Sequence, residues 1–155
     1  IESEREFTLA KVNFKLRLDR IDKTNQNDII IIDYKTGKFN IADLSGERPK
    51  APQLPLYYLA TSDLQPTAVM VVKLNSQGCE YEGISFKETA ITGVSAFPDQ
   101  WETFSSQWHD TLGNLAQDFY QGKAAVDPLE GAATCRYCHL QAFCRIYEQR
   151  GANDE

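Results

Sequence analysis

Residues 28–37 read Asp-Ile-Ile-Ile-Ile-Asp-Tyr-Lys-Thr-Gly, an apolar run that ends in two charged side chains. Such a run, bounded by polar residues, predicts a buried β-strand. Successive side chains of a strand point to opposite faces, so Asp33 and Lys35 share one face. Burying a carboxylate and an ammonium is costly unless both have partners. The pattern therefore predicts a binding site here, and a divalent cation with a phosphate ester is the ligand pair that fits best.

A second strand is predicted over residues 12–21, because apolar and polar side chains alternate from Val12 onward. The alternation points Asp19 away from the apolar face. Residues 23–27 form a polar turn, from which the isoleucine strand returns. The resulting hairpin brings Asp19 alongside Asp33 at one end.

The rest of the chain predicts an α/β fold with a mixed central sheet of about five strands flanked by helices. A further strand over residues 5–10 precedes the hairpin, and a long amphipathic helix follows the sheet. The expected elements after residue 37 are a helix over 53–61, strands over 68–74 and 79–86, a helix over 97–121, a loop over 127–134 and a short helix over 140–150.

The chain has 155 residues, which predicts one domain over residues 1–150 followed by a disordered tail over residues 151–155. No run is long and apolar enough for a membrane span, and no secretory signal is visible, so we expect a cytoplasmic protein. The formal net charge of −6 argues against a free-standing nucleic-acid binder. Carboxylates that hold metal contribute to that sum, however, and are neutralised in a working site. Since strand-like residues follow Ile1 at once, we expect a C-terminal fragment of a larger protein.

Asp19, Asp33 and Lys35 together fit a phosphodiester hydrolase site. Two carboxylates offer the oxygen ligands that Mg²⁺ or Mn²⁺ prefers, and the backbone carbonyl of Tyr34, between Asp33 and Lys35, can complete the coordination. Such a cation polarises a phosphate and lowers the pKa of a bound water, and a lysine can orient that water. The simpler interpretation is surface charge at strand ends with one salt bridge. Asp22 lies on the other strand face from Asp19 in the expected strand, and pairs with Arg20 instead.

Three segments, taken in order, resemble the PD-(D/E)XK nuclease superfamily and are more closely similar to the nuclease domains of RecB and AddB: Leu18–Asp22, Ile32–Gly37 and Gln53-x3-Tyr57. The resemblance implies a restriction-endonuclease-like core. It implies that Asp19 and Asp33 bind metal, that Lys35 is catalytic, and that Gln53 and Tyr57 support the site, with Gln53 near the lysine and Tyr57 toward a phosphate. The family also carries a His or Glu on an upstream helix; before Val12 this chain offers only the acidic side chains Glu2, Glu4 and Glu6.

Cys135, Cys138 and Cys144 form a cluster of the kind that ligates metal in chains without a secretory signal. Their spacing resembles the C-terminal part of the iron–sulfur staple of AddB-type nucleases, which implies a 4Fe–4S cluster. Such clusters normally need four thiolates, and a matching upstream cysteine is missing here. Zinc with His139 as fourth ligand is the second possibility. The third is no metal at all, with Cys144 as a small core residue.

The residues fit a Mg²⁺-dependent phosphodiester hydrolase, and the resemblance implies a deoxyribonuclease domain that acts in DNA repair or recombination, with DNA and a helicase-like region or subunit as partners. Arg48 and Lys50 are candidates for contacts to the DNA backbone. The alternative is a catalytically incomplete DNA-binding or partner-docking module of a helicase–nuclease-type protein. A third possibility is an acidic protein-interaction domain that binds no nucleic acid.

Overall fold

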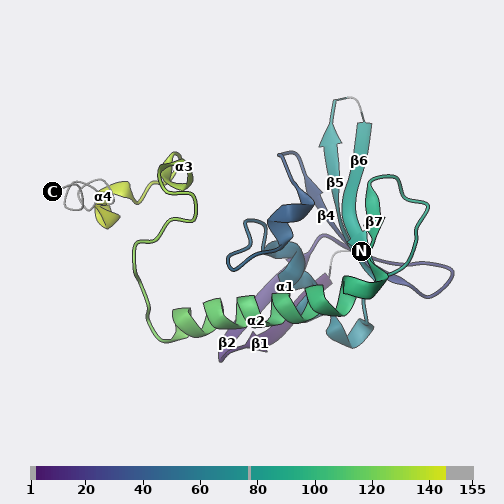
Figure 1. Cartoon of the computed structure of the whole chain (residues 1–155), viewed down its shortest axis with the longest axis horizontal. Coiled ribbons are helices and arrows are strands. Elements are labelled where there is room, and N and C mark those ends of the chain that lie inside the picture. Colours follow the sequence, from purple (N-terminus) through teal and green to yellow (C-terminus); the bar gives the residue numbers. More distant parts are fainter. Residues whose placement is uncertain (1–2, 77, 146–155) are drawn as a thin grey trace. The chain divides into compact units, whose positions relative to one another are not determined.

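The computed structural model describes residues 3–76 and 78–145 and divides the chain into two compact units, Ile1–Gln121 and Gly122–Glu155 (Figure 1). The single domain expected over residues 1–150 stays a prediction. The first unit contains β1 (Ser3–Leu9), β2 (Val12–Leu18), β3 (Arg20–Lys23), β4 (Ile29–Lys35), η1 (Ile41–Leu44), α1 (Gln53–Ala60), η2 (Ser62–Leu64), β5 (Ala68–Asn75), β6 (Gly78–Ser85), β7 (Val94–Ala96), η3 (Pro98–Gln100) and α2 (Trp101–Tyr120).

The central sheet has five strands in the order β3-β4-β5-β6-β7. β4 and β5 are parallel and are joined through α1. β3 runs antiparallel to β4 and β6 runs antiparallel to β5, whereas β7 is parallel to β6. This arrangement confirms the α/β class and the mixed sheet, and it is consistent with a restriction-endonuclease-like core. The first hairpin, β1-β2, forms a separate two-stranded sheet. Its strands are not among the five strands of the mixed sheet.

The strand expected over residues 12–21 is in fact two strands that meet at Asp19. Leu18 pairs with Ser3 of β1, whereas Arg20 pairs with Ile32 of β4, so the chain changes partner strands at this residue. The alternation of apolar and polar residues shifts by one position here, since two polar residues separate Leu18 from Ile21, and Leu18 is fully buried. This shift is the trace of the break in the sequence, and the single strand expected over residues 12–21 ran across it.

The two faces of β4 have different neighbours. Ile31 belongs to the larger core cluster, with Leu54 and Tyr57 of α1 and Trp108 of α2, whereas Ile32 packs with Met70 and Val72 on the other face. Side chains alternate along a strand, so Asp33 and Lys35 lie on the face covered by α1. The helix contacts β4 and β5 as well as the hairpin.

α2 confirms the predicted amphipathic helix, except that its first turn is the separate η3. Trp101 and Trp108 are buried, as their positions on the apolar stripe predicted. The indole nitrogen of Trp108 donates a hydrogen bond to the carbonyl of Leu44 at 2.8 Å. This bond ties η1, in the connection between β4 and α1, to the helix.

β7 was not predicted from the sequence, because it is only three residues long. It lies parallel to β6, and the turn before it requires Gly93. A Cβ built on Gly93 would lie 1.9 Å from the carbonyl oxygen of Tyr81, and the glycine has a φ of +89°. Only glycine adopts this backbone so close to a neighbouring strand.

The second unit contains two one-turn helices, α3 (Ala132–Cys135) and α4 (Gln141–Cys144). The predicted loop over 127–134 therefore ends in the start of α3. The predicted helix over 140–150 is observed only as α4, since residues 146–150 and the expected tail over 151–155 lie outside the described residues. Within the described part of the chain, no helix is both long and apolar enough to cross a membrane.

Candidate active site

Asp33 and Lys35 lie at the C-terminal end of β4 and contact each other. The Lys35 ammonium is 2.8 Å from Oδ2 of Asp33. The Asp33 side chain is only 2% exposed, whereas that of Lys35 is 27% exposed. The strand therefore presents a buried carboxylate and a solvent-accessible ammonium on one face, as the sequence predicted.

Asp19 reaches the same strand end from the break between β2 and β3. Its Oδ2 accepts a hydrogen bond from the backbone N–H of Tyr34 at 3.0 Å. Burial is the main cause that raises the pKa of Asp33; the Lys35 ammonium partly opposes it, and the nearby Asp19 carboxyl raises it further. The two carboxyl groups are therefore close enough to repel each other.

This donor set fits a divalent cation. Within the described residues, Oδ2 of Asp33 is a buried oxygen for which no hydrogen bond is found, although it forms an ion pair with the ammonium of Lys35 at 2.8 Å. Buried polar atoms are almost always satisfied, so a buried oxygen whose partner is an ion-paired ammonium can take a further partner. A cation held by carboxylate oxygens is such a partner. No group of three His, Cys, Asp or Glu side chains suited to a metal occurs in residues 3–76 and 78–145, so this pocket offers two carboxylates and not three.

Lys35 is the first member of a hydrogen-bonded chain that runs into α1. Its ammonium donates to Oε1 of Gln53 at 2.9 Å, and Nε2 of Gln53 donates to the hydroxyl of Tyr57 at 2.7 Å. The Tyr57 hydroxyl in turn donates to the carbonyl of Arg17 at 2.8 Å. Gln53 and Tyr57 can be bonded in this way because residues four apart lie on one helical face. This series of hydrogen bonds fixes the position of the Lys35 ammonium.

The position of Tyr57 differs from the expected phosphate contact. The hydroxyl donates its single hydrogen to the Arg17 carbonyl, and the residue is only 5% exposed. Burial, together with the charges of Asp33 and Asp19, raises its pKa despite the bond from Gln53. Tyr57 therefore remains a protonated donor that anchors Gln53, and it has no hydrogen left for a phosphate.

Tyr34 points to the opposite face of β4 from its two charged neighbours. Its hydroxyl accepts a hydrogen bond from Arg20 at 3.1 Å, and Arg20 also pairs with Asp22 at 2.7 Å. These bonds, the one to Asp22 first, raise the pKa of Arg20. The expected pairing of Arg20 with Asp22 is thus observed, and Asp22 is engaged away from the Asp19 site.

The other candidate residues do not join this cluster. Glu4 and Glu6 lie on the exposed side of β1, where Glu6 pairs with Lys15, and Glu2 lies outside the described residues. Arg48 is half-buried and Lys50 exposed in the loop before α1. Their role in binding DNA stays a prediction.

Cys135, Cys138 and Cys144 all lie in the second unit as free thiols and span the two short helices. Cys135 is buried, Cys138 exposed and Cys144 half-buried. Local bonds hold the segment: the N–H of Cys138 donates to the carbonyl of Cys135 at 3.0 Å, and the thiol of Cys144 lies 3.5 Å from the carbonyl of Gln141. The described residues do not bring the three sulfurs and His139 together as a metal site.

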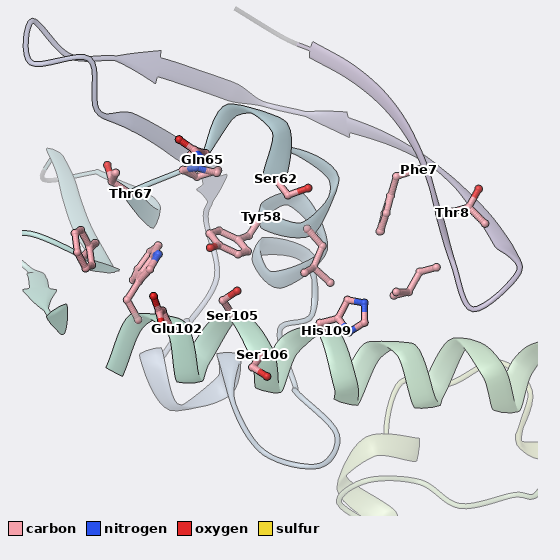
Figure 2. A pocket seen from close by; sticks show the side chains of 15 residues that line it. Phe7, Thr8, Tyr58, Ser62, Gln65, Thr67, Glu102, Ser105, Ser106 and His109 are labelled. Carbon is pink, nitrogen blue, oxygen red and sulfur yellow. The ribbon is translucent and has the colours of Figure 1, made fainter. Parts of the chain in front are cut away.

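A cavity of about 1020 Å³ lies elsewhere in the first unit, between β1, the C-terminal half of α1 and the start of α2. Figure 2 shows Tyr58, Ser62, Ser105 and His109 around it. Large pockets are the usual first candidates for active sites. This one is lined by hydroxyl groups and aromatic rings with Glu102 as its only carboxylate, and none of the residues of the Asp33 cluster lines it. The strand end, with its two carboxylates and its lysine, is therefore the better candidate for an active site.

Sequence reasoning missed two supports of the site. The Arg17 carbonyl holds Tyr57, and a backbone carbonyl leaves no trace in residue type. The Asp19 carboxylate accepts a hydrogen bond from the Tyr34 N–H, and this bond links the segment between β2 and β3 to β4. The shift in the apolar alternation between Leu18 and Ile21 would have suggested the second support.

A family model described as the PD-(D/E)XK nuclease superfamily matches residues 1–145. No curated protein matches the chain. A solved structure titled "Crystal structure of SSO0001" is similar at 20% identity with a TM-score of 0.49, over 93% of this chain and 57% of that one. The chain thus spans a little over half the length of that protein.

Proposed function

The chain belongs to the PD-(D/E)XK nuclease superfamily, and we propose that it is a metal-dependent nuclease domain that hydrolyses phosphodiester bonds in DNA. Nuclease activity is the function that membership of this family indicates. The observation that carries the proposal is the buried Oδ2 of Asp33, which lacks a hydrogen bond while a lysine and a second carboxylate lie beside it.

In the proposed site, Asp19 and Asp33 would hold Mg²⁺ or Mn²⁺ together with the backbone carbonyl of Tyr34. When bound, such a cation supplies Lewis-acid polarisation of the scissile phosphate and lowers the pKa of water. Lys35 positions the attacking water and stabilises charge that develops on the phosphate. Gln53 and Tyr57 keep the ammonium in place through the hydrogen bonds described above.

Cleavage of duplex and single-stranded DNA with added Mg²⁺ tests this proposal. Asp33→Asn and Lys35→Met should each abolish cleavage. Asp28→Asn and Lys87→Met are matched controls, because Asp28 and Lys87 form an ion pair of similar length, 2.7 Å, at the other end of β4. Cleavage that survives Asp33→Asn, or that both control substitutions remove equally, would rule the site out.

We further propose a RecB- or AddB-like role in DNA repair or recombination, in the cytoplasm, with a helicase-like region or subunit as partner. The cysteine segment would hold a 4Fe–4S cluster that needs a fourth thiolate from outside the described cysteine cluster. Iron and acid-labile sulfide in protein purified without oxygen, compared with Cys138→Ser, test this part. Equal iron in the two proteins would contradict it.

A second candidate function is a DNA-binding or docking module that no longer cuts. It is favoured by the donor set, since the described residues supply two carboxylates and no third metal-binding side chain beside them. In that case wild-type protein would bind DNA without cleaving it, and Asp33→Asn would leave its affinity unchanged.

A further inference from the structure

Lys73 lies directly beside Lys35 in the sheet. The two residues are partners in the parallel register of β4 and β5. They share one face, because Asp33 pairs with Val71 and Lys35 with Lys73 along the same alternating positions. Like charges directly opposite each other destabilise a sheet. The strand pair therefore accepts an electrostatic cost at the end that carries the candidate site.

Each lysine has its own carboxylate. Lys35 contacts Asp33, and Lys73 contacts Glu82 of β6. Glu82 pairs with Val71 in the sheet, so it lies in the same row as Asp33, two strands away. The face thus alternates in charge from Asp33 to Lys35 and from Lys73 to Glu82.

Glu82 does not depend on Lys73 alone. Its Oε1 accepts a hydrogen bond from the backbone N–H of Ile41 at 3.2 Å, whereas Oε2 contacts Lys73. If the ammonium turned away, the carboxylate would keep this bond and one-quarter exposure to water. Lys73 is also one-quarter exposed. The cost of separating the pair is therefore lower than for a fully buried ion pair, in which a bare charge would remain.

We propose that Lys73 is a second phosphate-binding cation, which contacts the nucleic-acid backbone next to the phosphate served by Lys35. Neighbouring strands are about 4.8 Å apart, so the two side chains reach adjacent oxygens of one bound strand. Glu82 holds Lys73 in the free protein and competes with the phosphate for it. This inference rests on the proposed function, since it places the substrate backbone along the same face.

The test measures DNA affinity against salt concentration in the presence of a chelator, where cleavage does not interfere. Lys73→Met should weaken binding about 10-fold at low salt. It should also reduce the salt slope by about 0.9 on duplex DNA or about 0.7 on single strands. Glu82→Gln should act in the opposite direction and tighten binding by about 2- to 5-fold, because it frees the lysine.

Lys87→Met is the matched control, since it removes the same charge from an ion pair at the far end of the sheet. It should leave the salt slope unchanged. An equal change in slope for Lys87→Met overturns the proposal, and so does weaker binding in both Lys73→Met and Glu82→Gln. Weaker binding in both variants is the result expected if the Lys73–Glu82 ion pair only stabilises the fold. Failure of the proposed function is separate: wild-type protein would show the same salt slopes yet cut no DNA with Mg²⁺.

Discussion

At the scale of single residues, Asp33 has opposite effects on folding and on chemistry. The fold buries its carboxylate beside another acidic group and leaves one oxygen without a hydrogen bond. A group whose pKa is higher in the folded than in the unfolded protein binds more protons in the folded state. Stability then falls as pH rises through that pKa. A metal site requires the ionised carboxylate of Asp33. Without a cation, this ionised form makes the folded protein less stable than the protonated form does.

We therefore predict that Asp33→Asn stabilises the metal-free protein at neutral pH. The gain should be about 0.5–2 kcal/mol, as is common when a functional site is relieved. It should shrink in acid, as Asp33 of the wild type becomes protonated through its raised pKa. Urea unfolding in chelator, repeated from neutral to acidic pH, measures both effects.

Asp28→Asn is the control for this measurement, because Asp28 is ion-paired with Lys87 and precedes the same strand. It should give no gain at neutral pH. A stability for Asp33→Asn that is equal to or below the wild type at neutral pH would contradict the raised pKa.

Tyr57 gives a second prediction at this scale. Tyr57→Phe removes the donor to the Arg17 carbonyl and the acceptor for Gln53, inside the core. The expected cost is about 1–3 kcal/mol in the free energy of unfolding, the range for an unsatisfied buried polar group. Cleavage should fall but not vanish, because Lys35 keeps its contact with Asp33.

Kinetics and salt dependence check the role of Tyr57. Positioning through Gln53 predicts a lower kcat and an unchanged salt slope of DNA binding. A phosphate contact by Tyr57 would instead reduce that slope.

At the scale of elements, the break at Asp19 creates the site. The chain leaves the ladder with β1 and enters the ladder with β4 at this one residue, and the carboxylate binds the Tyr34 N–H across the break. The same carboxylate is one of the two proposed metal ligands. Its structural and chemical roles can be separated, because an amide oxygen can accept the same hydrogen bond.

We predict that Asp19→Asn abolishes cleavage while it changes the free energy of unfolding by less than about 0.5 kcal/mol. Asp19→Ala should abolish cleavage and also cost about 1.5–3 kcal/mol, the value of a hydrogen bond to a charged group. Thermal or urea unfolding of the two variants in chelator makes the comparison. Equal stabilities would show that the bond to Tyr34 contributes nothing to the fold.

The elements themselves were largely predictable. The isoleucine strand and the strand from Ala68 are apolar runs, α1 is a short apolar helix, and α2 carries a strong period-3.6 pattern; all four were predicted. β7 and the two sheets were not, because short strands and pairing partners are decided by contacts distant in sequence. In the site, the expected pairing of Lys35 with Gln53 is observed, whereas the Tyr57 hydroxyl, expected to face a phosphate, donates to the Arg17 carbonyl. Helical spacing predicts which side chains share a face, but it does not predict which acceptor a hydroxyl donates its hydrogen bond to.

At the scale of the whole molecule, the first unit contains every residue of the candidate active site and the three hydrophobic clusters of the described residues, whose buried members run from Leu9 to Ala116. We predict that a fragment ending at Gln121 folds cooperatively and keeps the nuclease activity of the full chain. Near-ultraviolet circular dichroism and thermal unfolding test the first part, and DNA cleavage with Mg²⁺ tests the second.

The full chain is the control for this fragment. A folded fragment without activity would assign part of the site to residues 122–155, and a fragment without fixed tertiary structure would contradict the independence of the first unit.

The buried carboxylate of Asp33 has a consequence for how such sequences evolve. A substitution that neutralises this position removes an unfavourable charge, so inactive copies of such a domain fold at least as well as active ones. Selection for folding alone would therefore never preserve the acid, and only selection for cutting would. Lineages that lose the need to cleave should drift to Asn or an apolar residue here while the surrounding framework stays intact.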